Sequence, residues 1–469
     1  MKITLENIGK VKNAEIEIKG LTVITGGNNS GKTTVGKALF SLLNVISDYE
    51  KKAEVDQKIG MDIFLRDISR DVNEIQHLLY RMSFKEKSGL FDEHIKDIQI
   101  FIRKSFAEKN YVEFKNVLLA IKEEIDEILF NLGRNSANDN LPIGKQLLVE
   151  RSKIVIEKVT DILDRLENFD INDFVLNRIQ KSLNDEFSKQ IIPVRYNERK
   201  GNIKLQFAEY EPILFSVKDN QIEFVQITDR LFSPYRRVFL IDDPYLVDNL
   251  SDNMVPHNLY GSESKSIICK HDEHLVRYLR SHREDNYFAT WLNTKEKKDI
   301  YNFISEVMPG DRVDKSDGMY YVEKGAELKV SNLATGSKMF FLVKDLFEEG
   351  LLDRETVLIL DEPEAHLHPE WQNIFAEFIV RLVKFIGVKV LLTTHSPNFM
   401  LALETMSLQY KLGDVMQTYK TEMCDDGYQV TYRKVSDDLD IVYTDFIRAM
   451  VRMQTMKKRL LEGIDEDGK

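Results

Sequence analysis

Cysteine is scarce in this sequence, with only Cys269 and Cys424 among its 469 residues. Two cysteines cannot form the disulfide framework of a small secreted domain, and such a low count is typical of a reducing cytoplasm. Apolar runs are short as well, because none reaches the ~18 uninterrupted residues of a membrane-spanning helix. The first residues alternate like a strand and lack the apolar core of a signal peptide. We therefore expect a soluble cytoplasmic protein, and a role in membrane transport would require a separate membrane partner.

An excess of basic residues is also missing, since 65 Lys and Arg stand against 77 Asp and Glu, for a net charge of −12. This balance excludes passive coating of nucleic acid, so contact with DNA or RNA would need a local basic patch. Internal repeats and low-complexity linkers are absent too. The hydrophobic content of 43% and the charged content of 30% indicate a globular chain with a good core and a charged, helix-rich surface.

The most informative stretch lies near the N-terminus, where the apolar run Leu21–Thr25 meets the pattern G-x-x-x-x-G-K-[ST] and then a helix-compatible segment. Glycines at this spacing let the backbone curl so that successive N–H groups point at phosphate oxygens, and the following helix N-terminus adds its dipole. The lysine supplies a charge for the β- and γ-phosphates, and the threonine hydroxyl after it is placed to bind Mg²⁺. A plain strand–turn–helix connection is the alternative, and the strand and helix on either side argue against it. The residues expected to bind nucleotide are Gly26, Asn28, Asn29, Ser30, Gly31, Lys32, Thr33 and Thr34.

A second apolar strand, Val357–Leu360, ends in Asp361 and Glu362. Beside a phosphate loop, the Asp361 carboxylate is expected to hold Mg²⁺ through water. Glu362 is then the candidate general base that polarises the attacking water. Four apolar residues followed by Asp-Glu form a weak motif alone, and the residues that follow strengthen it.

Hydrophobic periodicity divides the chain into an α/β part and helical parts. The last third alternates buried apolar strands with helices, which predicts a parallel, doubly wound core. Residues 49–191, which follow the phosphate loop and its helix, carry apolar side chains at helical spacing. This pattern is typical of a helical insertion with at least one antiparallel hairpin. The expected divisions are an α/β head formed by 1–48, 192–244 and 319–435, the insertion 49–191, a helical subdomain 245–318 and a C-terminal helix 436–469.

Three smaller clusters have both a structural and a functional interpretation. Asp242-Asp243 at a strand end either cap the strand or hold a metal ion, and capping is the commoner case. Cys269 with His271, His274 and His282 is a conceivable zinc site, but one cysteine falls short of a structural zinc set, which favours surface histidines on a charged helix. The C-terminal helix carries Arg448, Arg452 and Arg459, which fit a solvated face first and a nucleic-acid or partner face second.

The run D-E-P-E-A-H-L-H-P over Asp361–Pro369, with T-T-H-S-P over Thr393–Pro397, resembles the ATP-binding-cassette ATPase superfamily. The similarity is to its soluble branch of RecF-like, OLD-like and chromosome-maintenance ATPases, and it covers roughly residues 1–45 and 328–400. It implies an α/β fold: an ABC-type P-loop ATPase head with a mixed β-sheet core and a helical insertion.

The resemblance also assigns roles to residues outside the phosphate loop. It implies that His395 is the switch histidine for the γ-phosphate and that Glu364–Pro369 forms the loop crossing a dimer interface. The signature loop that reaches a partner's ATP corresponds to Ala334, Thr335 and Gly336, where the family's usual serine is replaced by Ala334. Gln226, near a strand end, is the candidate for the glutamine of the metal site.

Together these residues imply an ATPase that binds ATP and Mg²⁺ and closes as a homodimer, or a higher oligomer, around the nucleotide. Relatives with a mid-sized insertion often act in bacterial anti-phage defence or DNA repair, with nucleic acid or a separate effector protein, such as a nuclease or toxin, as partner. No HNH-like cluster indicates a fused nuclease. Ala334 favours the alternative of a weakly hydrolysing sensor or scaffold. A transporter subunit fits poorly, because of the insertion and the D-E-P-E-x-x-L-H-P run.

Overall fold

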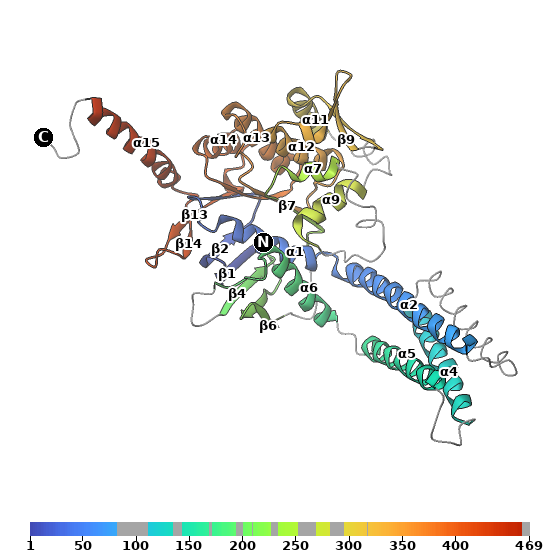
Figure 1. Cartoon of the computed structure of the whole chain (residues 1–469). Coiled ribbons are helices and arrows are strands. Elements are labelled where there is room, and N and C mark those ends of the chain that lie inside the picture. Colours follow the sequence, from blue (N-terminus) through green and yellow to red (C-terminus); the bar gives the residue numbers. More distant parts are fainter. Residues whose placement is uncertain are drawn as a thin grey trace. The chain divides into compact units, whose positions relative to one another are not determined.

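The computed structural model describes residues 1–81, 111–134, 143–167, 171–193, 200–208, 210–226, 233–251, 269–281, 295–316 and 318–461 (Figure 1). The chain divides into two compact units. The head unit contains residues 1–49, 175–258 and 268–469, and the helical unit contains residues 50–174.

The head unit is built on one sheet of 11 strands in the order β6-β5-β4-β1-β2-β14-β13-β3-β12-β11-β7. Five neighbours, from β13 to β7, run parallel, whereas β1, β2, β4, β5 and β6 form an antiparallel half. The expectation of a mixed sheet with a helical insertion is therefore confirmed. The strands are β1 (Lys2–Ile8), β2 (Val11–Glu17), β3 (Leu21–Thr25), β4 (Lys200–Gln206), β5 (Ile213–Lys218), β6 (Gln221–Gln226), β7 (Arg237–Ile241), β11 (Thr356–Asp361), β12 (Lys389–Thr394), β13 (Met416–Met423) and β14 (Val430–Lys434).

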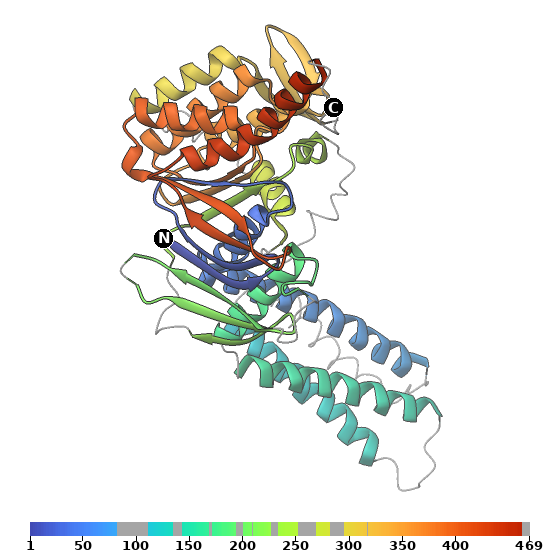
Figure 2. The same cartoon turned by 90° about the vertical axis from the view of Figure 1, so that its left-hand side faces the viewer.

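The parallel strands are almost wholly apolar because helices cover both of their faces. Helix α1 (Lys32–Ile46) contacts β7, β11 and β12. On the opposite face, α12 (Thr335–Glu348), α13 (Pro369–Arg381) and α14 (Pro397–Gln409) bring aromatic side chains onto the strands (Figure 2). Side chains alternate accordingly, so that Leu358 and Leu360 join this aromatic core while Ile359 faces α1.

Helix α1 lies unusually close to β11, and Gly36 allows this approach. A Cβ atom added at Gly36 would lie 3.0 Å from Ile359 Cγ2. A side chain there would push the helix away from the strand. Since α1 begins at the phosphate loop and β11 ends at Asp361, this contact sets the distance between the two halves of the expected site.

The antiparallel half contains a tight hairpin between β5 and β6. Strands β5 and β6 pair antiparallel, with Lys218 opposite Gln221. Asp219 and Asn220 between them have φ values of 50° and 66°. Positive φ at both central positions is the turn that matches the twist of two-residue hairpins, and Asp and Asn adopt it readily.

A second, small sheet of the head unit has the order β10-β9-β8 and is formed by β8 (Asp311–Lys315), β9 (Gly318–Glu323) and β10 (Ala326–Lys329). Strand β8 lies in the stretch 245–318 that the sequence indicated as helical. The head unit also contains the helices α6 (Ile171–Glu186), α7 (Leu246–Ser251), α9 (His271–Ser281), α11 (Lys295–Val307) and α15 (Asp440–Leu461). Short helical turns lie at Val330–Asn332, Leu382–Ile386 and Gly413–Val415.

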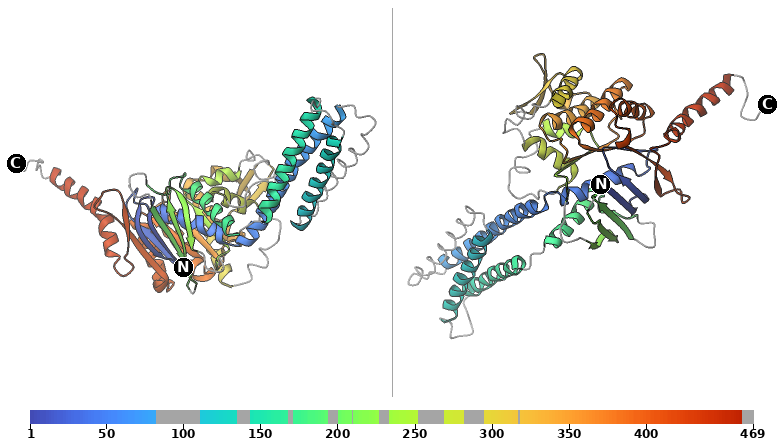
Figure 3. Two further views of the ribbon diagram at one scale, coloured as in Figure 1. Left: turned by 90° about the horizontal axis from the view of Figure 1, so that it is seen from below. Right: turned by 180° about the vertical axis from the view of Figure 1, so that it is seen from behind.

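The helical unit contains α2 (Tyr49–Arg81), α4 (Tyr111–Arg134) and α5 (Ile143–Glu167) (Figure 3). Their apolar stripes meet in one core that includes Ile68, Leu118 and Val155. Lys158 on α5 makes salt bridges to Asp67 and Asp71 on α2, at 3.0 and 2.5 Å. Within the described parts of the chain, no helix is long and apolar enough to cross a membrane.

A buried ion pair fastens the small sheet to α12. Arg312 on β8 pairs with Asp345, and both side chains are 3% exposed. Arg312 Nη2 also donates to the carbonyl of Leu279 on α9, at 3.0 Å. Removing one partner of such a pair leaves an uncompensated buried charge.

We therefore predict that Arg312→Met destabilises the head unit by roughly 3–5 kcal/mol, because the buried Asp345 carboxylate loses its ion pair with Arg312. Urea unfolding followed by circular dichroism measures the effect. The control is Arg236→Met, which removes an exposed pair with Glu355 and is expected to cost less than about 1 kcal/mol. Equal losses in both variants would contradict a special role for the buried pair.

Candidate nucleotide-binding site

The phosphate loop connects β3 to α1 and turns through two left-handed residues. Asn29 has a φ of 61° and Gly31, the residue before the helix, a φ of 72°. A Cβ atom at Gly31 would also lie 3.2 Å from Val430 Cγ2. The Tyr432 hydroxyl donates to the Gly31 carbonyl at 2.6 Å, so β14 supports the loop from outside. A glycine-containing loop of this kind before a helix N-terminus is the backbone arrangement that binds anions.

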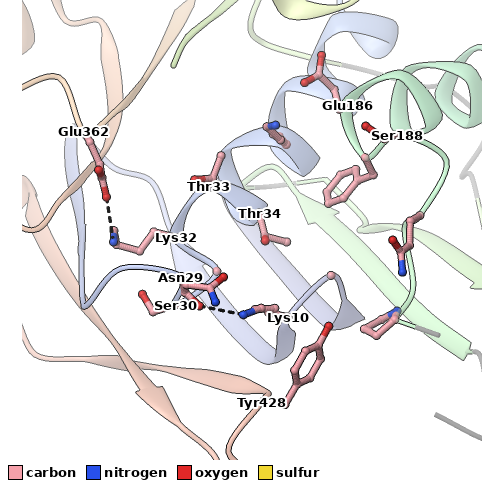
Figure 4. A pocket seen from close by; sticks show the side chains of 16 residues that line it. Lys10, Asn29, Ser30, Lys32, Thr33, Thr34, Glu186, Ser188, Glu362 and Tyr428 are labelled. Carbon is pink, nitrogen blue, oxygen red and sulfur yellow. Dashed lines mark hydrogen bonds and ion pairs between the residues drawn. The ribbon is translucent and has the colours of Figure 1, made fainter. Parts of the chain in front are cut away.

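Lys32 places its ammonium group inside the loop. Its side chain is 4% exposed, and Nζ lies 3.1 Å from Glu362 Oε1 (Figure 4). Nζ also donates to the carbonyls of Gly26 at 3.1 Å and Gly27 at 2.8 Å. The amine is therefore fixed at the mouth of the loop, where a phosphate oxygen would meet it.

Asp361 at the end of β11 faces the first turn of α1. Thr33 Oγ1 donates to Asp361 Oδ2 at 2.6 Å, and Thr393 Oγ1 donates to the other carboxylate oxygen. Burial raises the pKa of Asp361 above its usual range, although both hydroxyl hydrogen bonds act to lower it. The negative charge of Asp242, at the end of neighbouring β7, raises this pKa further. The site thus favours a bound cation.

These donors fit Mg²⁺. The ion prefers oxygen ligands and usually takes one or two carboxylates together with phosphate oxygens and water. Thr33 and Asp361 supply a hydroxyl and a carboxylate within reach of the loop that would hold the phosphates. Ser30 Oγ is buried and has no hydrogen-bond partner among the described residues, which suits a further polar ligand. No group of three or more His, Cys, Asp or Glu suited to a metal occurs in the described ranges.

Glu362 has a strained backbone, with a φ of 48°. Its N–H donates to the carbonyl and the hydroxyl of Thr393, at 3.2 and 3.0 Å. The left-handed turn places the carboxylate between the Lys32 ammonium group and the His395 imidazole, whose Nδ1 lies 3.2 Å from Glu362 Oε2. Strain held in place by hydrogen bonds is typical of functional residues.

A second carboxylate, Glu364, positions the segment that carries His395. Its Oε1 accepts from Thr394 Oγ1 at 2.5 Å and from the N–H of His395 at 3.3 Å. Burial raises the pKa of Glu364, against the effect of these hydrogen bonds. The two glutamates of the D-E-P-E run therefore differ: Glu362 is partly exposed, whereas Glu364 is buried and connects β11 to the end of β12.

A cavity of about 450 Å³ opens above the phosphate loop. Residues from distant parts of the chain contribute to it, and the sequence motifs did not indicate them. Lys10 bonds the Asn29 carbonyl at 3.3 Å and lies over the Tyr428 ring, with Nζ 5.2 Å from its centroid. Lys10, Lys32 and Lys37 make the cavity attractive to an anion. The lining residues are Gly9, Lys10, Asn29, Ser30, Gly31, Lys32, Thr33, Thr34, Lys37, Glu186, Phe187, Ser188, Gln190, Pro193, Glu362 and Tyr428.

The remaining candidates lie elsewhere. Ala334, Thr335 and Gly336 begin α12 and are not among the described residues that line the cavity. Thr335 Oγ1 lies 3.1 Å from the Tyr245 hydroxyl. Gln226 ends β6 at one edge of the sheet and does not line the cavity either. Asn28 is exposed at the tip of the phosphate loop.

A family model described as "AAA ATPase domain" matches residues 1–400. The chain belongs to the AAA ATPase domain family. This membership confirms the P-loop ATPase relationship that the phosphate loop and the acidic strand indicated. Membership of an ATPase family also implies that the chain binds a nucleotide.

Two curated proteins resemble this ATPase-domain chain over part of their length. "Endonuclease GajA" from Bacillus cereus (strain HuB5-5) is 21% identical over 404 residues, which are 81% of this chain and 52% of that protein. "Retron Vc95 probable ATPase" from Vibrio cholerae serotype O1 biovar El Tor is 24% identical over 221 residues, 44% of this chain and 41% of that protein. The chain thus spans about half the length of the curated relatives it matches, or less.

Solved structures show a weaker similarity. The SMC head domain from Thermotoga maritima has a TM-score of 0.38 and 11% identity, over 92% of this chain and 98% of that one. The "recombination mediator protein RecF-ATPrS in RecFOR pathway" has a TM-score of 0.35 and 10% identity, over 92% of this chain and 97% of that one.

The ATPase-domain chain holds a buried histidine beside this site, which corrects the expectation of surface histidines. His271 and His274 are 3% and 4% exposed, and His282 lies outside the described residues. His271 bridges two acids, with Nδ1 2.7 Å from Glu186 and Nε2 2.8 Å from Asp242. Asp242 therefore accepts from a histidine, and Asp243 caps the next turn by accepting from Tyr245 N at 2.8 Å.

The bridge links the cavity wall to the strand beside Asp361. Glu186 lines the cavity, and Asp242 follows β7. Burial alone would lower the pKa of His271, but its hydrogen bonds to Asp242 and Glu186 raise it to about 9. At neutral pH the imidazolium holds together α6, β7 and α9.

Because the folded-state pKa of His271 lies above the unfolded value of roughly 6.5, its bridge stabilises the fold fully below that pH. The contribution, at most about 3 kcal/mol, is lost as the pH rises through about 9. We predict that His271→Gln lowers the thermal midpoint at pH 6.5 and that its deficit shrinks by pH 10. The exposed His366→Gln is the control. A deficit that does not change with pH would show that packing alone matters.

Proposed function

We propose that the chain binds Mg-ATP in this cavity and hydrolyses it to ADP and phosphate. One observation carries the proposal: the fold brings Lys32 and Thr33 into contact with Glu362 and Asp361. The two pairs are far apart in the sequence, since 328 residues separate Thr33 from Asp361. These are the side chains that a P-loop ATPase needs.

In this proposal each residue has one task. Lys32 neutralises charge on the β- and γ-phosphates, while Thr33 and Asp361 hold the Mg²⁺ that stabilises the developing phosphate charge. Glu362 orients and deprotonates the attacking water, and its contacts with Lys32 and His395 keep the carboxylate at the γ-phosphate end. His395 then contacts the γ-phosphate. Lys10, Phe187 and Tyr428 enclose the far end of the cavity, where base and ribose would lie.

We further propose that the complete site requires two heads. The start of α12, with Ala334, Thr335 and Gly336, does not line the cavity of its own chain. A helix N-terminus of this length offers free N–H groups to a phosphate, and a second copy can present it to the nucleotide. Gly336 packs directly under the loop after β11, since an added Cβ would lie 2.6 Å from the His366 carbonyl oxygen.

Closure of such a homodimer around ATP gives the chain a means of controlling a partner effector or a DNA transaction. Relatives that carry the names of an endonuclease and a retron ATPase favour anti-phage defence, and the RecF-like motifs keep DNA repair as the other setting. Cytoplasmic action and a nuclease or toxin partner belong to this proposal.

The second candidate function is a sensor or scaffold that binds ATP and hardly hydrolyses it. Ala334 at the first turn of α12 supports it, because no hydroxyl stands at that position and the Thr335 hydroxyl lies within hydrogen-bond distance of Tyr245. Turnover decides between the two candidates.

We predict that Glu362→Gln lowers steady-state ATP turnover at least ~100-fold while ATP still binds, because only the base is lost. Lys32→Ala is expected to lose binding itself. Turnover is measured by phosphate release and binding by a fluorescent ATP analogue, with and without double-stranded DNA. Glu355→Gln, an exposed acid paired with Arg236, is the control. Bound ATP without turnover in the unaltered chain would favour the sensor.

We also predict that Glu362→Gln forms a dimer with Mg-ATP in light scattering and that adding Gly336→Ala weakens this dimer. The alanine must displace the His366–Leu367 segment at the expected interface, whereas the cavity of each head stays intact. Gly413→Ala is the matched control, since an added Cβ there meets nothing within 4 Å. A monomer that binds ATP in the Glu362→Gln variant would overturn the two-head proposal.

A further inference from the structure

The last helix, α15, is buried at its base and exposed at its end. Val442 is 2% exposed, and Phe446 packs against the main core. Two polar contacts fix the base: Asp445 pairs with Lys420 on β13, and Tyr443 bonds Glu404 on α14. From residue 451 to 461 every residue is exposed, and Figures 1 and 3 show the helix extending beyond the strands. An unsupported helix of this length is marginal in water.

The exposed end continues the apolar seam of the buried base. Apolar residues recur at alternating spacings of four and three: Val442, Phe446, Ala449, Met453, Met456 and Leu460. This is the heptad spacing of helices that pair with another helix. The first two positions are covered by the chain's own core, but Met453 is 63%, Met456 48% and Leu460 68% exposed. The apolar seam is thus covered by the core at its start and uncovered from Met453 to Leu460.

Charge along the same segment indicates what kind of helix completes it. From Ile447 to Leu461 the helix carries five basic residues and no acidic one, Arg448, Arg452, Lys457, Lys458 and Arg459. Arg452, Lys457 and Arg459 fall at the positions that flank the seam, where charges select the partner. A second copy of the helix would bring basic residues against basic residues in either orientation, which disfavours self-pairing. The sequence alone fitted these arginines to a solvated face, which leaves the exposed seam unexplained.

We propose that the outer half of α15 is a docking surface for an acidic amphipathic helix of another protein. The partner helix would cover Met453, Met456 and Leu460 with apolar side chains and place glutamates or aspartates beside the flanking basic residues. The surface is anchored to Lys420, whose strand pairs directly with β3 in the register Lys420 to Thr25. The base of the helix, rather than the partner itself, is therefore fixed one strand away from the phosphate loop.

Two designed three-heptad peptides test the proposal with the full chain. Both have leucine at the seam positions; one has glutamate and the other lysine at the flanking positions. Fluorescence anisotropy is expected to give at least tenfold tighter binding of the glutamate peptide, a difference of about 1.4 kcal/mol. The triple variant Met453→Ala, Met456→Ala, Leu460→Ala should lose this binding. The matched control, Ile447→Ala, Val451→Ala, Leu461→Ala, removes equally exposed apolar residues off the seam and should keep it.

Charge reversal supplies a gain-of-function test. Arg452→Glu, Lys457→Glu and Arg459→Glu together should reverse the preference to the lysine peptide, with helix content followed by circular dichroism. ATP turnover of the same variants separates this surface from the nucleotide site, since neither triple change touches the cavity.

Several results would overturn the proposal. If both peptides bind equally well, or if neither binds, the proposal of a charge-selective helix partner is wrong. Binding of vesicles of four parts phosphatidylcholine to one part phosphatidylserine, abolished by the seam variant and without peptide preference, would identify a membrane surface instead. Binding of a short DNA duplex through the basic residues would identify nucleic acid. If the seam variant has a lower molar mass in solution than the unaltered protein, the partner of this surface is a second copy of this chain.

Discussion

The buried negative charge at the ends of the parallel strands is the constraint on which the site depends. Asp361 and Asp242 follow neighbouring strands, and each needs compensation because burial disfavours an ionised carboxylate. Asp242 receives it from His271, a group of the protein itself. Among the residues that the structure describes, Asp361 receives only two hydroxyl hydrogen bonds, from Thr33 and Thr393. The fold therefore satisfies one acid internally and leaves the other suited to a cation that arrives with a ligand.

Local motifs made half of this site predictable. The phosphate loop and the strand ending in Asp361 are continuous segments whose conformations follow from glycine, apolar and acidic positions. Parallel strands end at the same sheet edge, so the sequence also implied that they meet. Lys10, Phe187 and Tyr428 could not be found this way, because each reaches the cavity through the pairing of distant strands and helices. The burial of His271 has the same origin, since its two acids come from α6 and β7.

The arrangement separates two functions of an ATP site along one chain. Lys32, Thr33 and Glu362, to which the proposal gives roles on the phosphates and the metal, line the cavity, whereas the start of α12 packs under the loop after β11 instead. That loop, Glu364–Pro369, begins two residues after Glu362 and is held by the contact of Glu364 with Thr394. A change at the γ-phosphate that moves Glu362 or His395 would therefore reach Gly336 through only a few covalent and hydrogen bonds.

The C-terminal helix shows where periodicity alone misleads. Its arginines are exposed, as a solvated face requires, yet the apolar Met453, Met456 and Leu460 are exposed as well. A sequence cannot distinguish a seam covered by its own core from one left open, because both have the same spacing. The fold decides the matter here: the core ends beside Phe446, while the seam continues to Leu460. The length of helix beyond the core is what an outside helix would have to cover.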